Sequence, residues 1–163
     1  MSKKQTKEER IEGLTELSSR YRGYVLERCV EVENSVNGYI MKFFFDDLKK
    51  GMLLVFYLLD RLSFDAKISV FQSMLQKRFG KDYKRNCDKM MGKIRAVKDD
   101  RNIFAHYLLN LRQDAPALGV SYFKMRNDVA LVNYDNDKMK IVFERIEECI
   151  VWIEGLQKGM KST

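Results

Sequence analysis

One short run of this sequence contains side-chain types that could cleave a phosphodiester bond. Arg101, Asn102 and His106 lie close together, and His106 is the only histidine of the chain. Imidazole gains and loses a proton near neutral pH, so it can act as a general acid or base. A guanidinium can hold a phosphate by two parallel hydrogen bonds and offset charge that develops in a transition state. The run therefore combines a phosphate clamp with a proton-transfer group.

A helix over this run would separate the two charged side chains. Spacings of four, three and four residues create one polar stripe, which consists of Arg95, Asp99, Asn102 and His106. Arg101 instead occupies a position in the apolar row between Val97 and Phe104. On an ideal helix its side chain would leave about 140° away from that of His106. The two can meet only if the helix is distorted, if Arg101 reaches far around it, or if a second subunit supplies the partner group.

A purely structural role is the alternative for both residues. A partly buried arginine is normally paired, and a carboxylate such as Asp60 or Asp65 could pair with Arg101. His106 would then be a capping or surface residue. We expect the adjacent acids Asp99 and Asp100 to lie at a helix terminus or to face solvent.

Positive charge is concentrated around the same run. The net charge is +7, and residues 75–101 alone contribute ten basic and four acidic side chains. Such a cluster is typical of proteins that bind polyanions, although a solvated helix face near a loop gives the same pattern. Lys93, Arg95 and Lys98 are the residues that we expect to attract a nucleic-acid backbone through salt-sensitive contacts.

Composition limits the class of protein. A chain of 163 residues suits one domain over residues 1–163. One proline and nine glycines favour long helices over a many-stranded sandwich. Cys29, Cys87 and Cys149 form neither a disulfide framework nor a CxxC metal motif. With no apolar leader and no apolar run long enough to span a bilayer, we expect a cytoplasmic protein without a membrane partner.

Hydrophobic periodicity predicts a mainly α protein. Residues 10–45 form one or two amphipathic helices, with Asn37-Gly38 as the interruption. Residues 47–61 are apolar almost all round, which predicts a helix at the centre of the core. Further helices are expected over 64–78, 82–112 and 137–158, the first of them N-capped by Ser63 and stopped at Gly80.

Alternating residues predict one β-hairpin. The two strands cover 120–125 and 129–134, and Arg126-Asn127-Asp128 form the turn. The expected fold is therefore an up-and-down helical bundle with a small hairpin before the last helix.

The string Arg101-Asn102-x-x-Ala105-His106 resembles the signature of HEPN-domain proteins, which is an arginine, four to six residues, and a histidine. The polar residue that commonly follows the arginine is Asn102 here. Residues 62–68 also resemble the helix that precedes the motif helix in that family. The resemblance covers residues 20–112, and the remainder of the chain fits by architecture.

This resemblance implies a metal-independent endoribonuclease without a cofactor. The family often acts in toxin–antitoxin and antiviral defence systems, so RNA and an antitoxin or other regulatory protein are the implied partners. Its members commonly form homodimers in which the paired motifs make one composite cleft. Arg101 in an apolar row would then face the dimer axis.

Roles follow for the individual side chains. His106 would be the general acid or base and Arg101 the phosphate clamp, while Asn102 would orient the site or bind a phosphate oxygen. Asp99 could orient His106, and Tyr107 could stack on a base or simply pack. Because RNA supplies its own nucleophile, the 2′-hydroxyl, the product would be a 2′,3′-cyclic phosphate. The alternatives are a non-catalytic HEPN-like module that binds RNA, a nucleotide or a protein, and a plain helical adaptor in which the motif is accidental.

Overall fold

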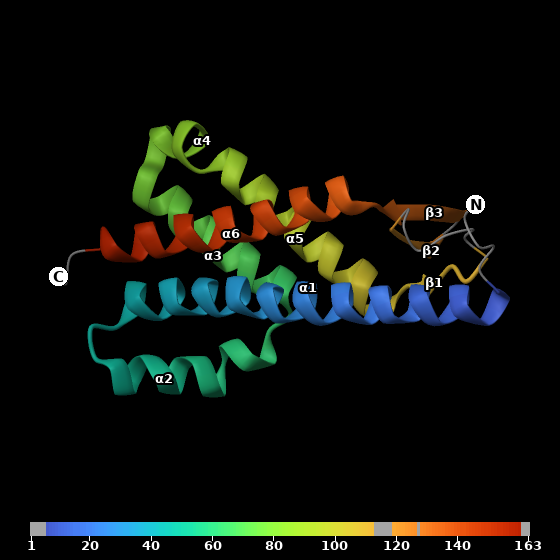
Figure 1. Cartoon of the computed structure of the whole chain (residues 1–163). Helices are drawn as coiled ribbons and strands as arrows, with labels where there is room; N and C mark the ends of the chain where they lie inside the picture. Colours follow the sequence, from blue (N-terminus) through green and yellow to red (C-terminus); the bar gives the residue numbers. More distant parts are fainter. Residues whose placement is uncertain (1–5, 113–118, 127, 161–163) are drawn as a thin grey trace. The chain divides into compact units, whose positions relative to one another are not determined.

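The computed structural model of the chain describes residues 6–112, 119–126 and 128–160. It is a helical bundle with a small antiparallel sheet before the last helix, as predicted (Figure 1). The α-helices are α1 (Lys7–Phe44), α2 (Leu48–Tyr57), α3 (Phe64–Phe79), α4 (Tyr83–Asn86), α5 (Asp88–His106) and α6 (Asn136–Lys158). Two short 3₁₀ helices are η1 (Leu59–Arg61) and η2 (Gly80–Asp82). The strands are β1 (Leu108–Leu109), β2 (Val120–Arg126) and β3 (Asp128–Tyr134).

The chain divides into two compact units. Unit 1 consists of Met1–Glu27 and Asp99–Glu144, and unit 2 consists of Arg28–Lys98 and Arg145–Thr163. The long helices α1, α5 and α6 each contribute residues to both units. The expectation of a single domain over residues 1–163 stays a prediction.

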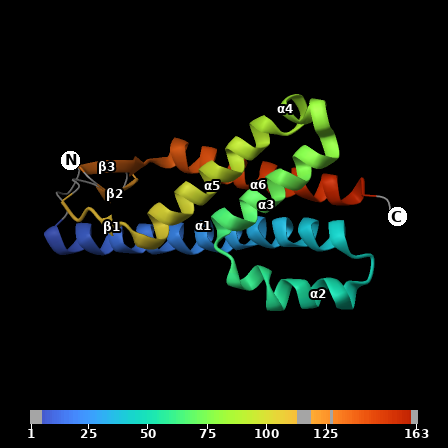
Figure 2. The ribbon, with the colours of Figure 1, turned by 180° about the vertical axis from the view of Figure 1, so that it is seen from behind.

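Unit 1 is built around the sheet and an aromatic cluster. The strand order is β1-β2-β3, with antiparallel pairing throughout. Both views draw these strands beside the N-terminal part of α1 (Figures 1 and 2). The ring centre of Phe104 lies 5.3 Å from the ring centre of Tyr122 and 4.7 Å from that of Tyr134. The predicted hairpin is confirmed, although Asn127 of its predicted turn lies outside the described residues.

Unit 2 packs α3 against parts of α1 and α6. The ring centre of Phe71 lies 4.9 Å from the ring centre of Tyr39 and 6.1 Å from that of Trp152. The predicted boundaries of α3 are confirmed to within a residue. Ser63 Oγ accepts a hydrogen bond from the Ala66 N–H at 3.2 Å, and Gly80 adopts a φ of 51° where the helix stops.

The expected interruption of the first helix is wrong. α1 runs without a break through Asn37-Gly38 for 38 residues. Gly38 has a packing role instead, because a Cβ there would lie 3.0 Å from Gln157 Nε2. That nitrogen donates a hydrogen bond to the Ser35 carbonyl oxygen at 2.7 Å. The glycine therefore lets a side chain of α6 reach the backbone of α1.

The expectation that residues 47–61 form a buried central helix is also wrong. Gly51 and Leu59 are its buried members, and most of its large apolar side chains are exposed. A Cβ at Gly51 would lie only 2.3 Å from Met41 Cγ, so α2 contacts α1 through its smallest residue. The bulky residues around the rest of the helix are left outside. Apolar periodicity predicts that a face will be covered, but it does not say that the same chain covers it.

The helix predicted over 82–112 is broken and shorter. It is interrupted at Cys87 between α4 and α5, and it ends at His106. Leu108 and Leu109 then form β1, which pairs with Phe123 and Tyr122 of β2. The helical spacing of the leucines was misleading because strand pairing supplies the backbone partners beyond His106.

Candidate functional site

The motif residues lie on the last two turns of α5, which is regular up to its end. The Tyr107 N–H still donates to the Ile103 carbonyl oxygen at 3.0 Å, so the helical pattern continues past His106. A helix of this geometry directs Arg101 and His106 about 140° apart. Distortion of the helix is therefore excluded as a way for the two side chains to meet.

Two side chains of this helix end, Phe104 and Asp100, contact the sheet and fix the rotation of the helix. Phe104 is fully buried between the rings of Tyr122 and Tyr134. Asp100 is only 8% exposed and accepts a hydrogen bond from the Tyr134 hydroxyl at 2.9 Å. The expectation that Asp100 faces solvent or ends a helix is thus wrong, because a tyrosine of β3 draws its carboxylate into the core.

Arg101 follows Asp100 directly and is half-buried. No residue that the structure describes in its unit forms an ion pair or side-chain hydrogen bond with it. Of the carboxylates that could have paired with it, Asp65 accepts from Lys98 Nζ at 2.7 Å, and Asp60 is exposed. A partly buried guanidinium normally has an anionic partner, so this one has the capacity to bind an anion from outside its unit.

His106 lies in a cleft of about 410 Å³ within unit 1. The cleft is lined by Thr15, Ser18, Ser19, Arg22, Ala105, His106, Tyr107, Leu108 and Leu109. His106 is exposed, and its imidazole has no hydrogen-bond partner within the described part of unit 1. Arg101 is not among the lining residues, so this cleft does not bring the two charged motif residues together.

Arg22 is the cation that shares the cleft with His106. Its Nη2 donates to the carbonyl oxygen of Tyr107 at 2.6 Å, and its Cζ lies 5.1 Å from the ring centre of Tyr122. Its Nε is buried without a hydrogen-bond partner in the described structure. The Tyr122 hydroxyl and Ser18 Oγ form a hydrogen bond at 2.9 Å on the same side of the unit. The cleft can therefore offer an anion a guanidinium, an imidazole and nearby hydroxyls.

Sequence reasoning missed Arg22 and Ser18, although one signal marks them. Ser18 is a polar residue between Leu14 and Tyr21 in the apolar series of α1, and it is only 4% exposed. Arg22 follows it one turn later, on the same side of the helix. A small hydroxyl in a core position indicates a polar partner across the interface, which here is Tyr122.

Of the three supporting motif residues, one lies in the cleft and two lie outside it. Tyr107 is half-buried and lines the cleft, whereas Asn102 is half-buried and Asp99 is exposed on α5 outside the lining set. Seven residues separate Asp99 from His106, which is a rise of about 10 Å along a regular helix. At that separation the Asp99 carboxylate does not orient the imidazole of its own chain through a direct hydrogen bond.

The three cations expected to bind RNA belong to unit 2 and have partners there. Lys93 pairs with Glu148, Lys98 pairs with Asp65, and Arg95 donates to Gln72 Oε1. The ammonium of Lys93 lowers the pKa of the Glu148 carboxyl group. Lysines of the same basic segment that are exposed and form no ion pair or side-chain hydrogen bond in the described part of unit 2 are Lys77, Lys81, Lys84 and Lys89. These four offer an approaching polyanion more unneutralised charge than the predicted three.

The cysteines do not belong to a reactive site. All three are buried thiols that form no disulfide. Burial raises the pKa of the Cys87 thiol and raises that of Cys149 to about 12. The thiolate is the reactive form of cysteine, so neither of these two residues is an activated nucleophile.

Comparisons with family models, curated proteins and solved structures give no match to this chain. Within the described ranges, no helix has both the length and the apolar character needed to cross a bilayer.

Proposed function

We propose that this chain is a metal-independent endoribonuclease of the HEPN type. The observation that carries the proposal is the state of Arg101, which is half-buried yet has no anionic partner among the described residues of its unit. A phosphate of a bound RNA would supply that partner. Exposed His106, five residues further along the same helix, adds the proton-transfer group that cleavage needs.

The reaction uses the RNA's own 2′-hydroxyl as the nucleophile. A bond forms between the 2′-oxygen and phosphorus, and the bond from phosphorus to the 5′-oxygen of the next nucleotide breaks. One proton leaves the 2′-hydroxyl and one is delivered to the 5′-oxygen, so no water is consumed. The products are a 2′,3′-cyclic phosphate and a free 5′-hydroxyl. His106 performs one of the proton transfers, and a guanidinium offsets the negative charge that develops on the phosphate oxygens.

The divergence of Arg101 and His106 favours a site that two copies complete. In such a site the Arg101 of one copy and the His106 of another act on the same phosphodiester. Arg22 would hold a flanking phosphate in the cleft that it shares with His106, and Tyr107 would contact a base there. Asn102 remains a proposed phosphate contact on the Arg101 side.

Cleavage of RNA in excess EDTA tests the proposal. The wild-type chain, Arg101→Ala and His106→Ala are compared on single-stranded and structured RNA, and product ends are analysed for cyclic phosphate. We expect each substitution to lower the cleavage rate by at least about 100-fold, through loss of a general acid–base group in His106→Ala and of electrostatic stabilisation in Arg101→Ala. Arg112→Ala is the matched control because Arg112 is an exposed arginine of the same unit.

Three results would count against this function. They are an inactive wild-type chain, equal cleavage by all variants, and a requirement for added metal ions. Circular dichroism of each variant confirms that lost activity does not reflect lost fold.

A non-catalytic RNA-binding module is the second candidate, and the same regular helix favours it. If no second copy joins the site, Arg101 and His106 remain about 140° apart and cannot act on one bond. Such a module would show RNA affinity that His106→Ala retains, with no cleavage by any variant. Filter binding of end-labelled RNA next to the cleavage assay separates the two candidates.

The family resemblance extends the proposal to a defence role, as a toxin or antiviral effector controlled by an antitoxin or other regulatory protein. Growth arrest on expression in a bacterial host, relieved by His106→Ala, is the expected outcome. Unimpaired growth of cells that accumulate the wild-type chain would contradict this role.

A further inference from the structure

The outer side of α2 and the adjoining end of α1 form an exposed apolar surface in unit 2. The side chains of this α2 surface are Phe44, Leu48, Met52, Leu53, Phe56 and Tyr57. Each is more than half exposed, from 54% for Leu53 to 69% for Phe56. Large apolar residues scattered singly need no explanation, but five on one short helix and a sixth at the end of the preceding helix do.

The size of this surface matches one side of a protein–protein interface. With side-chain areas of roughly 150–250 Å², the six residues expose on the order of 700 Å² together. The largest apolar patch on a typical monomer is about 300–600 Å². A standard interface buries about 800 Å² on each partner. The α2 surface is therefore larger than a monomer normally leaves open and close to what a stable dimer covers.

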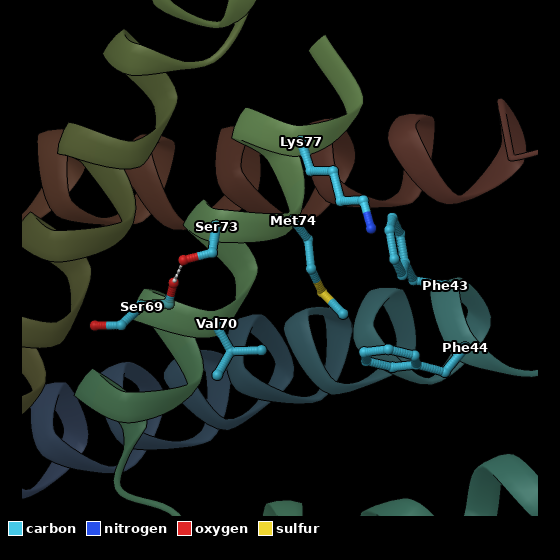
Figure 3. A pocket seen from close by; sticks show the side chains of 7 residues that line it. All are labelled: Phe43, Phe44, Ser69, Val70, Ser73, Met74 and Lys77. Carbon is cyan, nitrogen blue, oxygen red and sulfur yellow. Dashed lines mark hydrogen bonds between the residues drawn. The ribbon is translucent and has the colours of Figure 1, made fainter. Parts of the chain in front are cut away.

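A groove in the same unit adjoins the surface through Phe44. It has a volume of about 440 Å³ and is lined by Phe43, Phe44, Ser69, Val70, Ser73, Met74 and Lys77. Figure 3 shows the side chains of Val70 and Met74, both on α3, directed toward Phe44 at the end of α1. Unit 2 thus presents both protruding apolar side chains on α2 and an apolar hollow that could receive such side chains.

Charge around the surface favours a second copy over a polyanion or an anionic membrane. Residues 44–61 contain three acidic and three basic side chains, whereas residues 75–101 have an excess of six basic ones. The charges balance at each end of α2, with Asp46 and Asp47 beside Lys49 and Lys50, and Asp60 beside Arg61. An antiparallel pair of α2 helices therefore brings no excess of like charge together at either end, as a two-fold interface between identical surfaces requires. In a chain with net charge +7, the neutral segment is also where two copies repel each other least.

We propose that the α2 surface is a self-association interface, in which α2 of one copy packs in antiparallel fashion against α2 and the Phe44 groove of a second copy. This interface lies on α2 and not on the motif helix, so it differs from the one that the family resemblance implies. It goes beyond the proposed function and holds whether or not the chain cleaves RNA. Met52, Leu53, Phe56 and Tyr57 lie on the outward side of α2 and form the centre of the contact.

Sedimentation equilibrium of the full chain tests the interface directly. We expect a mass of at least twice 19.3 kDa for the wild-type chain at micromolar concentration, and a larger mass if copies also pair through the motif helix. Phe56→Glu should raise the dimer dissociation constant by at least about 100-fold, because the dimer contains this central aromatic residue twice. Val151→Glu is the matched control, since Val151 is 67% exposed on α6 of the same unit and receives the same charge. The control should keep the mass of the wild-type chain.

A cysteine substitution gives a second measurement that does not depend on tolerance of a charge. The native cysteines are buried, so a new thiol at the surface reacts alone. Under mild oxidation Leu53→Cys should form a disulfide-linked dimer and Val151→Cys should not.

The proposal would be overturned by a monomeric wild-type chain, by equal dissociation of both glutamate variants, or by absence of the Leu53→Cys dimer. Binding of the wild-type chain to neutral phosphatidylcholine vesicles, lost in Phe56→Glu, would assign the surface to a lipid instead. Because mass is measured, failure here is distinct from failure to cleave RNA.

Discussion

Arg22 donates a hydrogen bond from Nη2 to the carbonyl oxygen of Tyr107, at a distance of 2.6 Å. This bond joins α1 to the residue that directly follows the end of α5. The last carbonyls of a helix have no partner within the helix, and here a cation of a neighbouring helix supplies one. The position of His106 is thereby tied to α1 as well as to its own helix.

Substitution of Arg22 should loosen this end of α5. Arg22→Gln is expected to lower the free energy of unfolding by about 1.5–3 kcal/mol, the usual contribution of a hydrogen bond to a charged group. Urea denaturation measures the change. Arg20→Gln is the control, because Arg20 is an exposed arginine of the same helix. Equal stability of the two variants would show that the Arg22–Tyr107 bond does not contribute.

Tyr134→Phe should be destabilising without any change of core volume. It removes the hydroxyl that donates to the buried Asp100 carboxylate at 2.9 Å, while the ring contact with Phe104 is kept. We expect a loss of about 1–3 kcal/mol, the cost of removing one partner of a buried polar group. Thermal unfolding of Tyr134→Phe is compared with that of Tyr24→Phe, because residue Tyr24 is 41% exposed. A melting temperature as high as that of the control would contradict the assigned role.

Mixing two inactive variants should restore cleavage if two copies complete the site. Arg101→Ala retains His106, and His106→Ala retains Arg101, so a mixed dimer contains one intact pair. We expect each variant alone to be inactive in EDTA and the mixture to recover up to about a quarter of the activity, since random pairing makes about half of the dimers mixed and each of these has one of the two pairs intact. A site completed within one chain predicts no recovery. The control for exchange of subunits is a mixture of the wild-type chain with a chain that has both Arg101→Ala and His106→Ala.

Stability should fall as the solution becomes alkaline. Burial raises the pKa of the Cys149 thiol to about 12, whereas an unfolded cysteine titrates near 8.5. Between these values the unfolded chain has lost a proton that the folded chain keeps, so rising pH favours unfolding. Urea titrations of the reduced protein from about pH 8 to 10 should show this slope. Cys149→Ala should have a shallower slope, and an unchanged slope would exclude Cys149 as its source.

The regular elements were predictable because their signals are local. Ser63 and Gly80 mark the ends of α3 by capping chemistry that needs no tertiary partner, and the alternation over 120–134 is sufficient for a hairpin. The inward side of α6 was equally clear from its spacing, since Met139, Ile146 and Ile153 are all buried.

The errors all arise where a distant residue decides the local structure. Gly38 permits a contact with Gln157, and Gly51 permits one with Met41. Both glycines therefore have packing roles, whereas the helix propensity of glycine alone predicted a break at Gly38. Leu108 and Leu109 continue a helical spacing, yet pairing with β2 makes them a strand.

The candidate site shows the same limit. The residue types of the motif were visible in the sequence, as was the anomalous position of Arg101. The cleft around His106 was not, because Arg22 and Ser18 come from a helix more than eighty residues earlier. The partners of Lys93 and Lys98 were likewise hidden, since Glu148 and Asp65 lie far from them in the chain.

The shortness of β1 has a consequence for motion near His106. Among residues 107–112, Leu108 and Leu109 pair with β2, and one further backbone bond runs from the Asn110 N–H to the Ser121 carbonyl oxygen at 2.7 Å. A segment held by so few backbone bonds opens at a lower free energy than the body of a long helix. Amide protons of residues 107–110 should exchange with solvent sooner than those in the middle of α5. The imidazole therefore stands at the border between a slowly and a rapidly opening segment, where it can shift on ligand binding without the unfolding of its helix.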